Sequence, residues 1–131
     1  MTKQKILVVD DEKPLAMALK LKLTNSGYNV KAVFNGKEAI DSLEKEVFDL
    51  ILLDLVMPQM DGFQVLEEFS KKEMPGKIVV TSNLSQEEDE QKAKSMGAIH
   101  YFVKSDTPLA EIVKFIGKAL QKPLSKKTWT I

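Results

Sequence analysis

Short apolar runs divide this sequence, and they constrain its fold more than any other feature. Ile6–Val9, Leu50–Leu53 and Ile78–Val80 contain only apolar residues. Runs of this length are too short to cross a membrane and are typical of strands buried on both faces. Tyr28–Ala32 alternates apolar with polar residues, as a half-buried edge strand does, and Ile99–Val103 completes a set of five predicted strands.

The segments between these runs have the spacing of amphipathic helices. Leu15, Leu19 and Leu23 recur at every fourth residue, which places them on one face of a helix. Two further helices follow sequences of the capping-box type, Asn35–Glu38 and Ser85–Glu88. Five strands that alternate with five helices predict an α/β fold, in which a parallel sheet is covered by helices on both faces.

The last predicted helix begins at Thr107-Pro108, a capping residue followed by proline. We expect Pro123 to end this helix, because proline cannot donate the helical hydrogen bond. A chain of 131 residues is one domain by size. Residues 1–122 would form that domain, and residues 123–131, with the only tryptophan, Trp129, would form a short tail.

Composition limits the classes of function. Lys and Arg together number 19, as do Asp and Glu, and this balance argues against a broad surface for nucleic acid or membrane. The chain has no cysteine, which excludes disulfides, thiol catalysis and thiolate metal sites. Because the N-terminal residues lead directly into a strand and no run has the length of a membrane span, we expect a cytoplasmic protein without membrane contact.

Polar side chains stand at the ends of four predicted strands. In chain order they are Asp10, Asp11, Asp54, Ser82 and Lys104. The carboxyl ends of parallel strands share one edge of the sheet, where open α/β sheets build their sites. We therefore expect these five side chains to form one constellation.

The chemistry of this constellation favours phosphoryl transfer. Three carboxylates at one edge repel one another unless protons or a cation intervene, and their oxygens suit Mg²⁺ or Mn²⁺. With such a cation, the Ser82 hydroxyl and the Lys104 ammonium could bind the three oxygens of a phosphoryl group. Asp54 is then placed to attack phosphorus and form an acyl phosphate.

The motifs around these residues resemble those of response-regulator receiver domains. The motifs are Val8–Glu12, Asp54–Gly62, Thr81-Ser82 and Tyr101–Lys104, and they come in the family's order on the expected elements. The resemblance covers residues 5 to about 121 and implies a flavodoxin-like, doubly wound sheet of five parallel strands in the order 2-1-3-4-5. It also implies a single-domain regulator in two-component signalling, since no output domain follows residue 131.

The resemblance assigns a phosphoacceptor and a metal site. It implies that Asp54 takes a phosphoryl group from a histidine kinase or a histidine phosphotransfer protein. It makes Asp11 and Asp54 direct metal ligands, with Asp10 nearby and the backbone carbonyl of Val56 as a further ligand. The chain would then catalyse its own phosphorylation and dephosphorylation without acting as an enzyme on other molecules.

The resemblance also implies that Ser82 and Lys104 bind the transferred group. The choice between the adjacent hydroxyls of Thr81 and Ser82 matters, because they point to opposite faces of the strand. Ser82 lies 22 residues before Lys104, the spacing expected from the family. We therefore expect Ser82 in the site and Thr81 in its wall or in the core.

Tyr101 would be the aromatic switch of such a domain. Phosphorylation would change the surface formed by the fourth helix, the strand Ile99–Val103 and the last helix. That surface would contact a downstream protein or a second copy of the chain. Phe115 borders the buried stripe of the last helix and is either a contact on this surface or a rim residue of the core.

One departure from the family keeps alternatives open. Ser105 stands where the family usually has proline, and we leave open whether the Lys104–Ser105 peptide is cis. A degenerate receiver that only binds a partner therefore remains an alternative, although the complete set of site residues argues against it. A haloacid-dehalogenase-like phosphatase would need a second aspartate two residues after Asp54, where this chain has Val56.

Overall fold

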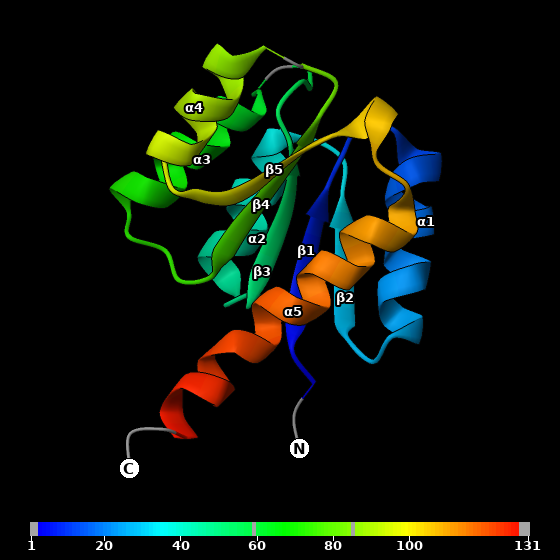
Figure 1. The fold of residues 1–131 in the computed structure, drawn as a ribbon. Helices are drawn as coiled ribbons and strands as arrows, with labels where there is room; N and C mark the ends of the chain where they lie inside the picture. The colour runs from blue at the N-terminus through cyan, green and yellow to red at the C-terminus, as the bar shows by residue number, and fades with distance from the viewer. Residues whose placement is uncertain (1–2, 59, 85, 129–131) are drawn as a thin grey trace.

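The computed structural model describes residues 3–58, 60–84 and 86–128, with side chains up to residue 121. Helices cover both faces of one five-stranded parallel sheet (Figure 1). The strand order β2-β1-β3-β4-β5 confirms the doubly wound, flavodoxin-like fold. The strands are β1 (Lys5–Val9), β2 (Asn29–Val33), β3 (Leu50–Asp54), β4 (Lys77–Ser82) and β5 (Ala98–Val103), and the helices are α1 (Lys13–Asn25), α2 (Gly36–Lys45), α3 (Gly62–Lys71), α4 (Glu87–Ser95) and α5 (Leu109–Thr128).

The strands form where the apolar runs predict them. All residues of the central β3 are buried, and so are Ile6–Val9 in β1. The edge strand β2 alternates, with Val30 and Val33 buried and Asn29 and Lys31 exposed. Continuous runs therefore became strands covered on both faces, and the alternating segment became the half-covered edge.

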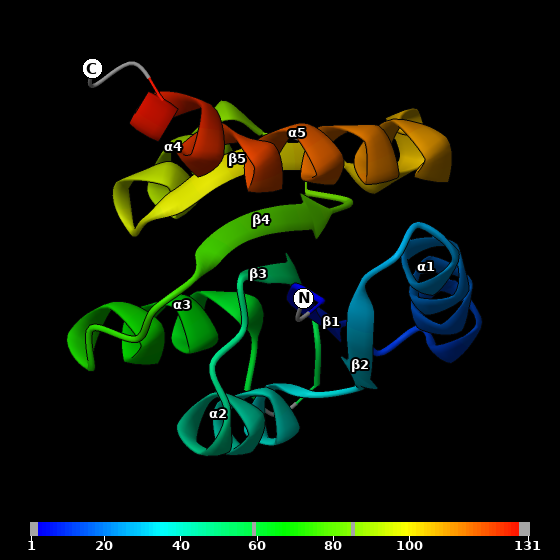
Figure 2. The same cartoon turned by 90° about the horizontal axis from the view of Figure 1, so that it is seen from below.

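Two apolar layers attach the helices to the sheet. α1 and α5 cover one face with side chains such as Leu19 and Ile116, and α2, α3 and α4 cover the other (Figure 2). Each fully buried leucine or isoleucine contributes about 1.5–3 kcal/mol. α4 places only Ala93 among the buried residues, so it is the helix with the weakest apolar anchor, as its polar sequence predicts. Within the described residues, no helix is both long and apolar enough to span a bilayer.

The helix starts agree only in part with the capping boxes expected from the sequence. Asn35 caps α2 by accepting a 2.8 Å hydrogen bond from the Glu38 N–H. The Glu38 carboxylate accepts from the N–H of Phe34, also at 2.8 Å, and not from the cap residue. α4 begins after Gln86, which makes no side-chain cap bond, and the expected cap residue Ser85 lies outside the described residues.

The ends of α1 and α4 carry glycine in the left-handed conformation. Gly27 follows α1 with a φ of 101°, and Gly97 follows α4 with a φ of 110°. Glycine adopts this conformation without the steric cost that a Cβ atom brings. Both helix ends lie where the sequence predicts them.

The prediction that Pro123 ends the last helix is wrong, because α5 continues to Thr128. A proline at this position removes the N–H that would bond the carbonyl of Ala119, four residues earlier. The Lys77 ammonium, from the start of β4, donates a 2.6 Å hydrogen bond to that carbonyl. The acceptor that proline leaves free is therefore satisfied by another element. Trp129 lies outside the described residues.

Candidate functional site at the carboxyl edge of the sheet

The five side chains selected from the sequence come from elements that end at one edge of the sheet. Asp10 and Asp11 follow β1, Asp54 and Ser82 are the last residues of β3 and β4, and Lys104 follows β5. All five strands run in the same direction, so their carboxyl ends meet at the upper edge of the sheet in Figure 1. This is the edge at which doubly wound sheets bind their ligands.

Asp10, Asp11 and Asp54 form a compact acidic cluster. One carboxylate oxygen from each lies within 4.8 Å of the others. Asp10 and Asp54 are only 1% and 3% exposed. Backbone groups fix their orientation, since the Glu12 N–H donates to Asp10 Oδ1 at 2.9 Å and the Val56 N–H donates to Asp54 Oδ1 at 3.2 Å. Each of these two carboxylates keeps its second oxygen for another partner.

Lys104 supplies the positive charge beside this cluster. Its Nζ lies 2.8 Å from Asp10 Oδ2 and donates to Asp54 Oδ2 at 3.1 Å. The same Nζ lies 3.5 Å from Oε1 of Glu12, which was not among the site residues expected from the sequence. The position of Glu12 directly after Asp10 and Asp11 is the sequence feature that could have indicated this contact. The Glu12 carboxylate is mostly exposed, so this third contact adds little stability.

Burial and neighbouring charges shift the pKa values of these groups. Burial raises the pKa of Asp54 to about 6, while the charge of Lys104 opposes that rise and the charge of Asp10 adds to it. Burial likewise raises the pKa of Asp10, against its interaction with Lys104. Burial alone would lower the pKa of Lys104, but Asp10 and Asp54 together raise it. Two buried carboxylates therefore share one lysine, which compensates their charge only in part.

The donor set fits a divalent cation. Asp10 Oδ2 is buried, and its one charged partner among the described residues is the Lys104 ammonium, whose Nζ lies 2.8 Å away. The same ammonium also serves Asp54, so it compensates the buried charge of Asp10 only in part, and incompletely compensated buried charge is costly. Hard oxygen ligands of this kind are those that Mg²⁺ prefers. The backbone of Val56, expected to add a carbonyl ligand, is hydrogen-bonded directly to Asp54.

Ser82 and Tyr101 are linked through the backbone of Leu84. The Ser82 hydroxyl is fully buried and accepts the Leu84 N–H at 3.1 Å. The Tyr101 hydroxyl donates to the Leu84 carbonyl at 2.8 Å, and Tyr101 as a residue is 7% exposed. Thr81 is buried beside them. The backbone link through Leu84 could not be predicted from the sequence, because any residue at this position would offer the same N–H and carbonyl.

The Lys104–Ser105 peptide, whose isomer the sequence left open, is trans, as are all peptide bonds of the described residues. Lys104 begins a short 3-10 turn, Lys104–Asp106. Its side chain contacts both Asp10 and Asp54 from this backbone. The replacement of the family's proline by serine therefore does not remove the lysine from the site.

Phe115 packs against β5. Its ring stacks on His100 with centroids 4.3 Å apart and meets Phe102 edge to face at 5.5 Å. It is half-buried against the core layer between α1, α5 and the sheet. This placement is that of a rim residue of the core whose exposed part lies between β5 and α5.

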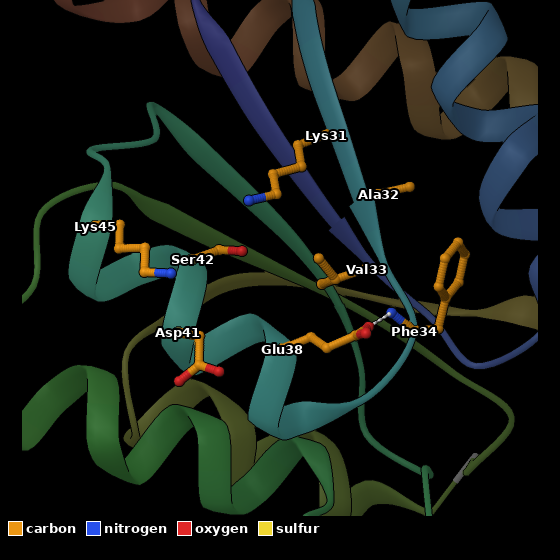
Figure 3. Close-up of a pocket in the computed structure, with 8 residues that line it drawn as sticks. All are labelled: Lys31, Ala32, Val33, Phe34, Glu38, Asp41, Ser42 and Lys45. Atoms are coloured by element: carbon orange, nitrogen blue, oxygen red, sulfur yellow. Dashed lines mark hydrogen bonds between the residues drawn. The ribbon is translucent and has the colours of Figure 1, made fainter.

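A groove elsewhere on the molecule is separate from this constellation. It lies between β2 and α2 and has a volume of about 260 Å³ (Figure 3). Its lining residues are Lys31, Ala32, Val33, Phe34, Glu38, Asp41, Ser42 and Lys45. None of the five strand-end residues is among them. The candidate site is the acidic edge, where Lys104 meets the cluster of three aspartates.

Comparison with known sequences agrees with this geometry. The family model of the response regulator receiver domain matches residues 6–116. Regulatory protein VanRc of Enterococcus gallinarum is 35% identical over 111 residues, which make up 85% of this chain and 48% of VanRc. The chain thus spans about half the length of this curated relative.

Solved structures show the same fold. A CheY-like receiver domain protein of Methanospirillum hungatei is 25% identical with a TM-score of 0.88, over 95% of this chain and 99% of that one. Response regulator TrrA of Thermotoga maritima, solved with Mg²⁺ and BeF, is 32% identical with a TM-score of 0.77, over 88% and 97%. Receiver domains are phosphoacceptors that bind Mg²⁺ at an acidic pocket and interact with histidine kinases and downstream targets. The motifs, the fold and these comparisons show that the chain belongs to the response-regulator receiver-domain family of two-component signalling.

Proposed function

We propose that the chain accepts a phosphoryl group on Asp54 from a phosphohistidine donor, in a reaction that depends on Mg²⁺ or Mn²⁺. One observation carries this proposal: Asp10, Asp11 and Asp54 cluster beside Lys104 at the carboxyl edge of the sheet. An aspartate that only capped a loop would have no reason to be buried beside a second buried carboxylate and close to a third. The donor would be a histidine kinase or a histidine phosphotransfer protein, as in the family.

In the proposed step, Asp54 attacks phosphorus in line with the leaving imidazole. The bond from a carboxylate oxygen to phosphorus forms as the P–N bond of phosphohistidine breaks. The electron pair of the broken bond goes to the imidazole nitrogen, which takes a proton from solvent, and the product is an acyl phosphate. Asp54 must be ionised to attack, and a pKa of about 6 leaves it mainly as carboxylate at neutral pH.

Asp10, Asp11 and Asp54 would hold the metal ion, with the carbonyl of Val56 as a further ligand. A bound ion would neutralise charge on the phosphoryl oxygens and on the carboxylates around them. Asp10 Oδ2, which shares the Lys104 ammonium with Asp54, would gain a second positive partner. The cluster that is costly without a cation would then become a stable ligand set.

Lys104 and Ser82 would bind the transferred group from the other side. Lys104 Nζ already donates to Asp54 Oδ2, so it lies beside any group that this carboxylate carries. The Ser82 hydroxyl accepts from the Leu84 N–H, so its own proton is free to donate to a phosphoryl oxygen. Both interactions place positive or donor groups where negative charge would collect.

The signal would leave the site through Ser82, Leu84 and Tyr101. When Ser82 turns toward the phosphoryl group, its bond to the Leu84 N–H is lost, and the Leu84 carbonyl that anchors Tyr101 can move. α4 has the weakest apolar anchor and packs beside β5. The surface of α4, β5 and α5 would change for a downstream protein or a second copy of the chain. The charge balance of 19 to 19 favours such a protein target over nucleic acid.

The donor protein would dock where it can reach Asp54. Met17 and Leu21, one helical turn apart on α1, are 47% and 62% exposed. α1 starts directly after the loop that carries Asp10 and Asp11. Exposed apolar side chains at this spacing suit a helix of a partner protein. A donor that draws its phosphoryl group from ATP would place this encounter in the cytoplasm.

The test is incubation with acetyl phosphate and Mg²⁺, followed by measurement of the intact mass. We expect one added phosphoryl group on the wild type, and none after removal of the metal or in Asp54→Asn. Asp41→Asn, which removes an exposed carboxylate from α2, is the matched control and should be phosphorylated as the wild type is. Release of inorganic phosphate without a retained group would favour the phosphatase. An unchanged mass would favour a domain that only binds.

A further inference from the structure

Close packing at Gly62 holds the two ends of the loop that follows Asp54 together. The N–H of Gly62 donates to the Leu55 carbonyl at 2.8 Å and joins the two ends of the loop. A Cβ atom at Gly62 would overlap the carbonyl oxygen of Asp54 and lie 2.5 Å from the Cα of Leu55. Only glycine permits this approach of two backbones. Val56, at the start of the loop, is thereby kept next to Asp54.

The same loop is also contacted by the start of α2. Gly36 is the first residue of α2, and a Cβ atom there would overlap the carbonyl oxygen of Met60 and lie 2.8 Å from its Cβ and Cγ. Gly36 is not among the glycines with positive φ, so space, and not conformation, requires glycine here. The backbone of α2 therefore lies directly against the backbone of the loop.

The start of α2 has little freedom to yield. The Asn35 side chain accepts from the Glu38 N–H, and the Glu38 carboxylate accepts from the Phe34 N–H, both at 2.8 Å. Gly36 itself and the following Ala39 are buried. A side chain added at Gly36 would therefore press against Met60, in the loop that follows Asp54.

We propose that Gly36 is a positioning residue for the metal and phosphoryl site. By packing on Met60, it sets the position of the loop that carries Val56. Val56 has two tasks in the site, because its N–H orients Asp54 Oδ1 at 3.2 Å and its carbonyl is a proposed metal ligand. Mg²⁺ requires near-ideal octahedral geometry, and ligand distances vary by only about 0.2 Å between good sites. This inference deepens the proposed function and rests on it.

Gly36→Ala tests the inference through metal affinity. Mg²⁺ would be titrated into ¹⁵N-labelled protein, and the amide shift of Val56 would give both the Kd and the state of the loop. Thermal unfolding without metal would report stability separately. We expect the Kd for Mg²⁺ to rise about tenfold or more, the loss typical when a group that supports metal ligands is displaced.

Two other glycines provide matched controls. Gly27 has a φ of +101° and nothing within 4 Å of an added Cβ, so Gly27→Ala lowers the melting temperature by backbone strain alone. Gly117 has only the Tyr28 hydroxyl at 3.7 Å, an ordinary contact, so Gly117→Ala fits. Neither residue contacts the loop after Asp54. Both variants should bind Mg²⁺ with the wild-type Kd.

The outcomes separate the inference from the function on which it rests. If Gly36→Ala binds Mg²⁺ as tightly as Gly27→Ala does at a similar loss of melting temperature, the role of Gly36 is refuted. If the wild type itself shows no Mg²⁺ binding, the proposed function and the inference both fail. If Gly36→Ala does not fold, Met60→Gly is the second variant, because it removes the Cβ and Cγ atoms that lie against Gly36 and keeps the backbone carbonyl. That variant should bind Mg²⁺ several-fold more weakly, and an unchanged Kd would overturn the inference.

Discussion

The ionised Asp54 carboxylate should destabilise the metal-free protein, and Asp54→Asn should remove this destabilisation. Asp54 is 3% exposed, and burial raises its pKa from 3.8 to about 6. An acid with a higher pKa in the folded state adds stability below its unfolded pKa and loses that stability as pH rises through its folded pKa. The metal-free wild type should therefore lose stability between about pH 4 and pH 7.

The size of this effect follows from the shift. A rise of about 2 pKa units, at about 1.4 kcal/mol each, corresponds to about 3 kcal/mol at pH 7. The charge of Asp54 also helps to hold Lys104, and asparagine gives up that attraction. We therefore expect Asp54→Asn to be about 1–3 kcal/mol more stable than the wild type at pH 7. At pH 4 the difference should approach zero, because Asp54 is then protonated.

Urea unfolding of both proteins from pH 4 to pH 7, with a chelator present, measures this difference. Asp41→Asn, on the exposed side of α2, should change stability by less than about 0.5 kcal/mol. Saturating Mg²⁺ should stabilise the wild type much more than Asp54→Asn. An Asp54→Asn protein that is no more stable than the wild type at pH 7 would refute the reasoning that this carboxylate carries uncompensated charge.

Three further changes test other parts of the structure. Burial lowers the pKa of His100 below 6.5, so the stability linked to its neutral form is present above that pH and is lost as pH falls. His100→Phe should make the free energy of unfolding less dependent on pH between pH 7 and pH 5, and an unchanged pH dependence would contradict this prediction. Lys77→Met leaves the Ala119 carbonyl without its donor and should lower the free energy of unfolding in urea by about 1–3 kcal/mol. An unaltered urea midpoint would count against this contact. Tyr101→Phe removes the hydrogen bond to the Leu84 carbonyl and should lower the free energy of unfolding by about 1 kcal/mol. The Kd for Mg²⁺ should not change, and weaker Mg²⁺ binding would show that Tyr101 acts on the metal site.

The sheet could be predicted because a strand buried on both faces needs a continuous apolar run. Ile6–Val9, Leu50–Leu53 and Ile78–Val80 met that requirement and became β1, β3 and β4. Such runs do not specify the order of the strands, which was predicted from the family resemblance. The end of α5 was mispredicted because Lys77, which satisfies the carbonyl freed by Pro123, lies 42 residues before Ala119.

The acidic edge could be predicted because polar residues at the ends of parallel strands must meet. That rule predicts that Asp10, Asp11 and Asp54 lie close together, as they do in the structure. Contacts made by backbone atoms could not be predicted, since their sequence signal is weak. The bond from Tyr101 to the Leu84 carbonyl is of this kind, and so is the packing of α2 on the loop after Asp54.

The most direct test asks which side chain carries phosphorus. Borohydride reduces an acyl phosphate to an alcohol, so it marks the phosphorylated aspartate permanently. After phosphorylation with Mg²⁺ and reduction, peptide mass spectrometry would locate the mark. We predict that it falls on Asp54 and requires the metal. A mark on Asp10 or Asp11, or a phosphorylated protein with no reduced aspartate, would contradict the assignment of Asp54 as the acceptor.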